Sequence, residues 1–262
     1  MVELIGGQRG IDKAVEELTF IHGYPSIMTD MPQSKATLGS VIAWMKKTGS
    51  PKVRAGMTRY GLPIANAVGI PVGVLRAEAK RIGPDHALAL KLWKTGLFEA
   101  QLLASMLGDP KLLTPAQMQS WCADFDNWGT VDTACFTLFD RSAHSWKMVP
   151  KWVKQKSEFQ KRAGFVLMAC LAAHDKKTAA AAFLKLLPMI EKGASDERNF
   201  VKKGVSWALR HIAHRNAALH LAAMNTAAKL SKSDDPAERW VGKDALRDIT
   251  RPAVIAKVKA RR

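Results

Sequence analysis

The chain has 262 residues, of which 47% are apolar and 24% charged, so it can bury a large core and is not expected to be disordered. Its 40 Lys and Arg against 23 Asp and Glu give a formal net charge of +17, which favours nucleic acid over an anionic membrane surface as the partner. No run of eighteen apolar residues predicts a membrane-spanning helix, and the N-terminus lacks the unbroken apolar stretch of a secretory signal. We therefore expect a cytoplasmic protein associated with the nucleoid.

Helix-forming residues dominate the chain, and turn residues divide it into segments long enough for one or two helices each. Residues 1–50 form a weakly patterned prefix with one predicted helix around Lys35–Lys47. The expected breaks between helices contain Gly with Pro, Ser or Asp, and they fall at 49–51, 69–71, 83–85, 108–110 and 193–196. The pattern predicts an all-α fold without strands.

Three cysteines, Cys122, Cys135 and Cys170, are spread through the middle of the chain. Their odd number, their apolar neighbours and the lack of Cys-x-x-Cys spacing indicate buried thiols rather than disulfides or zinc ligands.

The segment from Asp124 to Phe136 places a carboxylate among apolar side chains. Asp126 or Asn127 is a plausible N-cap, and in a helix that begins there Trp128 and Asp132 share one face. Burying an unpaired carboxylate is costly, so Asp132 needs either a functional role or a structural partner. The structural partner could be Arg162 or hydrogen-bond donors of a loop. Arg162 could neutralise Asp132, grip a phosphate, or do both.

Two helix starts further along the chain resemble each other. The basic run from Phe159 to Arg162 and the run from Phe200 to Lys203 are offset by 41 residues, from 159 to 200. HEAT and armadillo repeats have periods of about 40–47 residues. This offset favours a solenoid of stacked helical pairs, organised as a single repeat domain over residues 1–262.

The predicted helix from Phe200 to His214 carries a tryptophan away from its apolar stripe. At 100° per residue, Val201, Val205 and Ile212 cluster on one face, whereas Trp207 points nearly opposite them, as do Lys203, Arg210, His211 and His214. Such a residue either meets a ligand or packs against another helix, and the geometry favours neither.

The remaining basic residues are candidates for contacts with phosphates. Lys161, Lys202 and Lys203 lie at the two related helix starts, where they are either phosphate-facing or solvated. The tail, residues 250–262, is also basic and either adds phosphate contacts or frays.

These segments together resemble one family. Asp124–Asp132, Phe159–Phe165 and Arg198–Arg210, preceded by Met57–Tyr60 and by short matches at 69–70 and 75–76, look like the DNA alkylation repair family, the AlkD-like HEAT-repeat glycosylases. The resemblance runs in order over residues 53–215. It implies a C-shaped stack of helical pairs with a basic concave groove, and hydrolytic release of N3- and N7-alkylated purines from duplex DNA without metal or cofactor.

The resemblance also implies roles for particular residues. The family's catalytic aspartate matches Asp132, its sugar-contacting tryptophans match Trp128 and Trp207, its active-site arginine matches Arg162, and a DNA-facing tyrosine matches Tyr60. We take Arg210 and His214 as further candidates for DNA contact, because they flank Trp207 on the same helix face.

Three functions remain open from the sequence. The first is a glycosylase in which Asp132 stabilises positive charge on the sugar while a cationic base departs. The second is a non-catalytic protein of the same fold that binds damaged or branched DNA, and the third is a protein-interaction scaffold with little affinity for DNA. Nothing in the sequence demands a partner subunit, so we expect a monomer.

Overall fold

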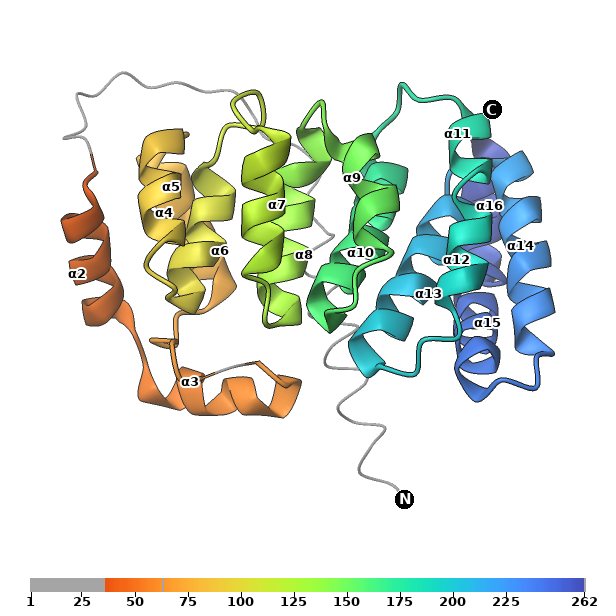
Figure 1. The fold of residues 1–262 in the computed structure, drawn as a ribbon, viewed down its shortest axis with the longest axis horizontal. Helices are drawn as coiled ribbons and strands as arrows, with labels where there is room; N and C mark the ends of the chain where they lie inside the picture. Colours follow the sequence, from red (N-terminus) through yellow and green to blue (C-terminus); the bar gives the residue numbers. More distant parts are fainter. Residues whose placement is uncertain (1–35, 63, 262) are drawn as a thin grey trace. The chain divides into compact units, whose positions relative to one another are not determined.

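The computed structural model describes residues 36–62 and 64–261, and every regular element in these ranges is helical (Figure 1). The all-α prediction is therefore confirmed for the described residues. They cluster into two compact units, one ending at Leu107 and the other beginning at Gly108. The single repeat domain expected from the sequence stays a prediction, and most of the N-terminal prefix lies outside the described residues.

The first unit contains five α-helices and one 3-10 turn among its described residues. They are α2 (Leu38–Thr48), α3 (Pro51–Met57), η1 (Thr58–Tyr60), α4 (Val72–Ile82), α5 (His86–Trp93) and α6 (Phe98–Leu107). The helix predicted around Lys35–Lys47 corresponds to α2, whose Thr37 cap accepts a hydrogen bond from the Ser40 amide at 3.2 Å.

A buried glutamate holds the long connection between η1 and α4. Glu99 is fully buried in the first turn of α6, and its carboxylate accepts hydrogen bonds from the amides of Val68, Gly69 and Ile70 at 3.0, 2.7 and 3.2 Å. Gly69 is required here, because its φ of 84° is left-handed and a Cβ would lie 2.2 Å from the Ser50 carbonyl oxygen. The loop is thus fixed by a carboxylate whose role the sequence pattern did not indicate.

The second unit contains the remaining helices. They are α7 (Pro115–Ala123), α8 (Trp128–Thr137), η2 (Phe139–Arg141), α9 (Ser145–Trp152), α10 (Glu158–His174), α11 (Ala180–Leu184), α12 (Leu187–Gly193), α13 (Asn199–Ala213), α14 (Ala217–Ser231), α15 (Pro236–Ile249) and α16 (Pro252–Ala260). The two related sequence runs open α10 and α13, and these two helices pack along each other (Figure 1).

Helix α10 forms the centre of this unit. Every residue from Arg162 to Ala172 is buried, and the helix contacts α7, α8, α9 and α13. A helix that is apolar on all sides must be surrounded by other helices. Its neighbour α9 approaches closely, since a Cβ at Gly164 would lie 2.6 Å from the Val153 nitrogen. Side chains on the first turns of α10 are therefore held in fixed positions.

The helix boundaries follow local sequence signals. All five predicted breaks fall outside helices or at their ends. Ser50, Thr114 and Asp235 cap helices whose first residue is Pro, where the missing N–H costs nothing. The basic tail is helical over most of its length in α16, with Val254 and Val258 buried. No helix among the described residues is long and apolar enough to span a membrane.

Candidate active site around Asp132 and Arg162

Helix α8 positions the candidate carboxylate. Asn127 is its N-cap and accepts a hydrogen bond from the Thr130 amide at 2.9 Å, so one of the two predicted caps is the observed one. Trp128 and Asp132 lie four residues apart, and therefore on one face of the helix. Asp132 is buried to 1% exposure and Trp128 to 6%.

Arg162, one turn into α10, binds both oxygens of this carboxylate. Its Nε donates to Asp132 Oδ1 at 3.0 Å and its Nη2 donates to Oδ2 at 2.7 Å, a two-point contact that fixes both planar groups. Its Nη1 donates to the main-chain carbonyl of Phe200, at the start of α13, at 2.7 Å. Three helices thus meet at one guanidinium.

Burial and the ion pair act on Asp132 in opposite directions. Removal from water raises the pKa of its carboxyl above the ordinary aspartate value, while the charge and hydrogen bonds of Arg162 lower it. Burial is the larger influence, so the ionised form of Asp132 depends on Arg162. Arg162 is itself nearly buried, which leaves little water to screen the attraction.

The three cysteines are buried and unpaired, as the sequence predicts. Burial raises the pKa of Cys122 to about 12, and the pKa values of Cys135 and Cys170 lie well above the ordinary thiol value. A thiol held protonated in this way is a poor nucleophile. Among the described residues no group of His, Cys, Asp and Glu is arranged to hold a metal ion.

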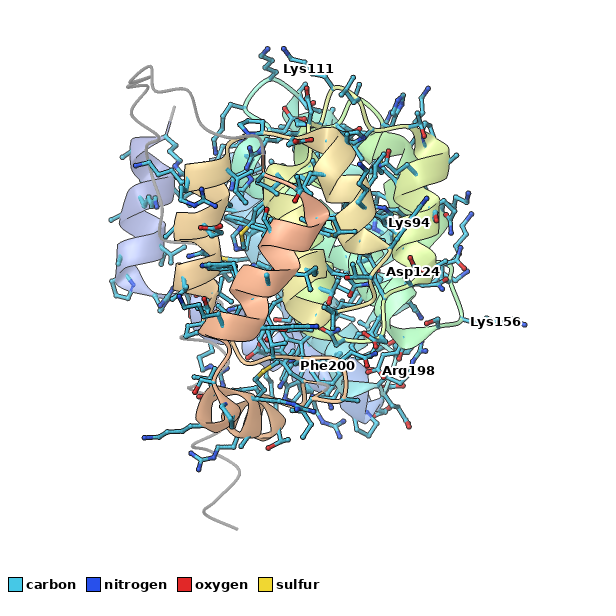
Figure 2. All side chains as sticks on the ribbon, turned by 90° about the vertical axis from the view of Figure 1, so that its left-hand side faces the viewer. Lys94, Lys111, Asp124, Lys156, Arg198 and Phe200 are labelled. Carbon is cyan, nitrogen blue, oxygen red and sulfur yellow. The ribbon has the colours of Figure 1, made fainter. Side chains whose placement is uncertain are left out.

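A second set of polar contacts joins the N-terminal ends of α10 and α13. Lys161 Nζ lies 2.7 Å from Asp196 Oδ2, and Arg198 binds both oxygens of the same carboxylate. Arg198 Nη1 also donates to the Lys156 carbonyl at 2.6 Å, and Figure 2 labels both residues toward the lower right of the view. Glu158 accepts from the Phe200 amide at 3.2 Å. We call Glu158, Lys161, Asp196 and Arg198 the α10–α13 clamp.

The clamp explains why the Phe200 carbonyl is available to Arg162. Its ionic contacts fix the segment that leads into α13, and the amide and the carbonyl of Phe200 are each bound by a side chain of α10. Sequence reasoning missed Glu158, Asp196 and Arg198 as members of the site. The charged run from Asp196 to Arg198, directly after a Gly-Ala-Ser break, is the signal that would have indicated an anchored turn.

Trp207 lies one turn beyond the place where α13 contacts Arg162. A Cβ at Gly204 would be 3.6 Å from Arg162 Cγ, which shows how near α13 comes to that side chain. Trp207 is only 6% exposed, and its ring meets the ring of His211 edge-on with centroids 5.8 Å apart. The indole is therefore buried and contacts a ring of its own helix, and its contact with a ligand stays a prediction.

The candidate DNA-contacting residues belong to both compact units. Tyr60 is 39% exposed and lies in η1 of the first unit. Lys202 lies over the Trp240 ring, 5.3 Å from its centroid, and His214 Nε2 is 2.8 Å from Asp248 Oδ2. Lys203 and Arg210 are partly buried on α13. In the second unit, the structure brings Arg162 to Asp132 and binds Lys161 and His214 to other carboxylates.

Comparison with known proteins defines the class to which this fold belongs. A solved structure described as "a new family of proteins related to the HEAT-like repeat DNA glycosylases with affinity for branched DNA structures" aligns with 81% of this chain and 95% of its own. The TM-score is 0.68 at 19% sequence identity, a likeness that shows the fold. The chain is therefore an all-α protein of the HEAT-like repeat type.

The sequence comparison identifies the family. The model of the DNA alkylation repair enzyme family matches residues 41–249, which is most of the chain, and the chain belongs to this family. The match extends beyond residues 53–215, where the quoted motifs lie, and it covers parts of both compact units. A search of curated proteins gave no match.

Proposed function

We propose that this protein is a DNA glycosylase that hydrolyses the N-glycosidic bond of cationic N3- and N7-alkylated purines in duplex DNA. The observation that carries the proposal is the carboxylate of Asp132, bound through both oxygens by Arg162 and buried on the same helix face as Trp128. Membership of the DNA alkylation repair enzyme family supports a role in DNA repair.

The residues suit the electronic demand of this reaction. Alkylation makes the purine a positively charged leaving group, so little protonation of the base is needed, and positive charge develops on the sugar as the bond breaks. A fixed carboxylate stabilises that charge without reorganising during the reaction. A carboxylate has about four lone-pair sites and Arg162 occupies two, which leaves Asp132 able to interact with the sugar or to orient a water molecule.

Arg162 then acts through Asp132. Three of its N–H groups are bound within the protein, two by Asp132 and one by the Phe200 carbonyl. This arrangement favours a positioning role over the alternative of gripping a phosphate. The indole rings of Trp128 and Trp207 would add cation–π attraction for the developing charge on the sugar.

Base release from a duplex with one N7-methylguanine tests the proposal. We expect the wild type to release the base and Asp132→Asn to do so about 10²–10³-fold more slowly, the usual loss for one preorganised electrostatic group. Glu197→Gln, at an exposed position before the clamp residue Arg198, removes one negative charge as the matched control and keeps the wild-type rate. Melting curves of both variants separate chemistry from stability. A wild-type rate no higher than that of Asp132→Asn would refute the proposal.

One observation favours a second candidate function. Asp132 is 1% exposed, and Arg162 binds both of its oxygens, as expected of a purely structural ion pair. The structural relative described as having affinity for branched DNA shares this fold. A non-catalytic protein predicts no base release from the alkylated duplex and tighter binding to a four-way DNA junction than to a linear duplex of equal length.

A further inference from the structure

Four basic side chains gather at the C-terminal ends of α10 and α13, at the opposite end of these helices from the clamp. Lys176 Nζ donates to a carbonyl in the last turn of α10, and Arg215 Nη1 donates to another there at 2.8 Å. Arg261, directly after α16, donates to the carbonyl of His214, the neighbour of Arg215. Lys257 lies one turn earlier on α16. We call Lys176, Arg215, Lys257 and Arg261 the C-terminal cation cluster.

Acidic side chains do not neutralise this cluster. Among the described residues none of the four forms an ion pair with a carboxylate. Asp175 is the neighbouring acid, and its oxygens already accept hydrogen bonds from the Thr178 hydroxyl at 2.6 Å and from the Trp146 indole at 2.9 Å. The pKa of Lys176 is lowered, by burial first and then by the other three cations.

The C-terminal ends of α10 and α13 compensate only part of the positive charge of the cluster. Each carries the equivalent of about half a negative charge, so two helix ends and Asp175 leave roughly two of the four positive charges uncompensated. Lys176, Lys257 and Arg261 are exposed, whereas Arg215 is half-buried, with its guanidinium 3.8 Å from the centroid of the Phe183 ring. Three of the four cations are therefore accessible to an anion in solution.

The separation between the cluster and the Asp132 site follows from the length of helix α10. Both are in the second unit, and Arg162 and His174 are twelve residues apart on α10, which corresponds to about 18 Å at 1.5 Å per residue.

We propose that the C-terminal cation cluster binds backbone phosphates of duplex DNA that flank the nucleotide at the Asp132 site. This inference rests on the proposed engagement of DNA at Asp132, but it does not require base release. The cluster thus extends the DNA contact beyond the lesion, and it contributes affinity without sequence preference, because phosphates carry no base identity.

The salt dependence of binding to an unmodified 24-base-pair duplex tests the proposal, measured by fluorescence anisotropy between about 50 and 200 mM KCl. Each phosphate contact contributes about 0.9 to the slope of log affinity against log salt. The triple variant Lys176→Gln, Lys257→Gln and Arg261→Gln should lower the slope by about two to three. The control triple Lys185→Gln, Lys192→Gln and Lys232→Gln removes the same charge at exposed positions of the same unit and should leave the slope within about one of the wild type.

Two single-residue variants test the same point with less risk of misfolding. Lys257 and Lys259 are both exposed on α16, but they are two residues apart and so point in different directions. Lys257→Gln should lower the slope by about one, and Lys259→Gln should leave it unchanged. If the triple variant has the same slope as its control triple, and Lys257→Gln the same slope as Lys259→Gln, the proposed role of the cluster is refuted. The proposed engagement of DNA at Asp132 is not affected by that result. Absence of salt-dependent DNA binding by the wild type overturns both this inference and the proposed engagement of DNA at Asp132.

Discussion

Replacing Arg162 with Met removes the guanidinium but keeps much of the side-chain volume. Asp132 then remains 1% exposed without a counter-charge, and the Phe200 carbonyl loses its donor. Breaking a buried pair by deleting one partner costs about 3–5 kcal/mol. Small and medium-sized domains have about 5–15 kcal/mol of stability in total, so we expect a large fall in the urea midpoint of the second unit.

A double variant separates the buried charge from lost packing. When Asp132→Leu is added to Arg162→Met, no carboxylate remains to be desolvated, and at least about 2 kcal/mol of the lost stability should return. Additive losses from the two substitutions would show that the pair is not coupled. The two Met variants keep identical packing at position 162, so their difference reports on Asp132.

The pH dependence of the single variant provides an independent check. Without Arg162 the pKa of Asp132 rises further, because burial is no longer opposed. A raised native pKa means that the folded protein binds the proton more tightly than the unfolded chain, so the penalty of Arg162→Met should shrink as the pH falls. A penalty below about 1 kcal/mol at neutral pH, or one that grows on acidification, would refute the account of the ion pair.

Two further predictions concern Glu99, which is buried, and His211, which is partly buried. Glu99→Gln leaves one acceptor oxygen where three amides need partners, so it should lower the free energy of unfolding by about 2–4 kcal/mol and speed hydrogen exchange at Val68–Ile70. The control Glu78→Gln, whose partner Arg81 is exposed, should lower it much less in the same melting and exchange measurements. Burial, with His214 and Arg210 nearby, lowers the pKa of His211 to about 3. The unfolded chain therefore binds a proton at His211 below about pH 6.5, whereas the folded protein does not. Between pH 7 and 5, the free energy of unfolding of the wild type, measured in urea, should fall by up to about 2 kcal/mol more than that of His211→Gln. An equal loss in both proteins would contradict a neutral His211.

The helices and their boundaries were predictable because their signals are local. The helix boundaries follow signals that extend over a few residues, namely Gly and Pro breaks and Ser, Thr or Asp before Pro. The pairing of α10 with α13 follows from a pattern that repeats after 41 residues. The placement of Asp132 among apolar side chains followed from helical spacing, and Arg162 was named as its possible partner. Whether that pair serves catalysis or structure alone is a question for base-release measurements.

The other contacts depend on how helices approach each other in space. The exposure of Trp207 could not be deduced from one helix, because a residue opposite one apolar stripe can face a second layer of helices. The hydrogen bonds from three loop amides to Glu99, and from Lys161 to Asp196, join residues about 30 or more positions apart, for which no periodic signal exists. The hydrogen bond to the Phe200 carbonyl is invisible in any sequence, because every residue carries that group.

The use of the Phe200 main-chain oxygen as the acceptor for Arg162 affects how this site can change in evolution. Because Arg162 is oriented by main-chain oxygen, substitution of the Phe200 side chain leaves the acceptor in place, and position 200 is free to vary as long as the backbone keeps its path. Variation at that position among relatives would therefore say nothing about whether the acceptor is retained. Substitutions that shift α13 along α10 would remove the acceptor while leaving every residue of the ion pair intact.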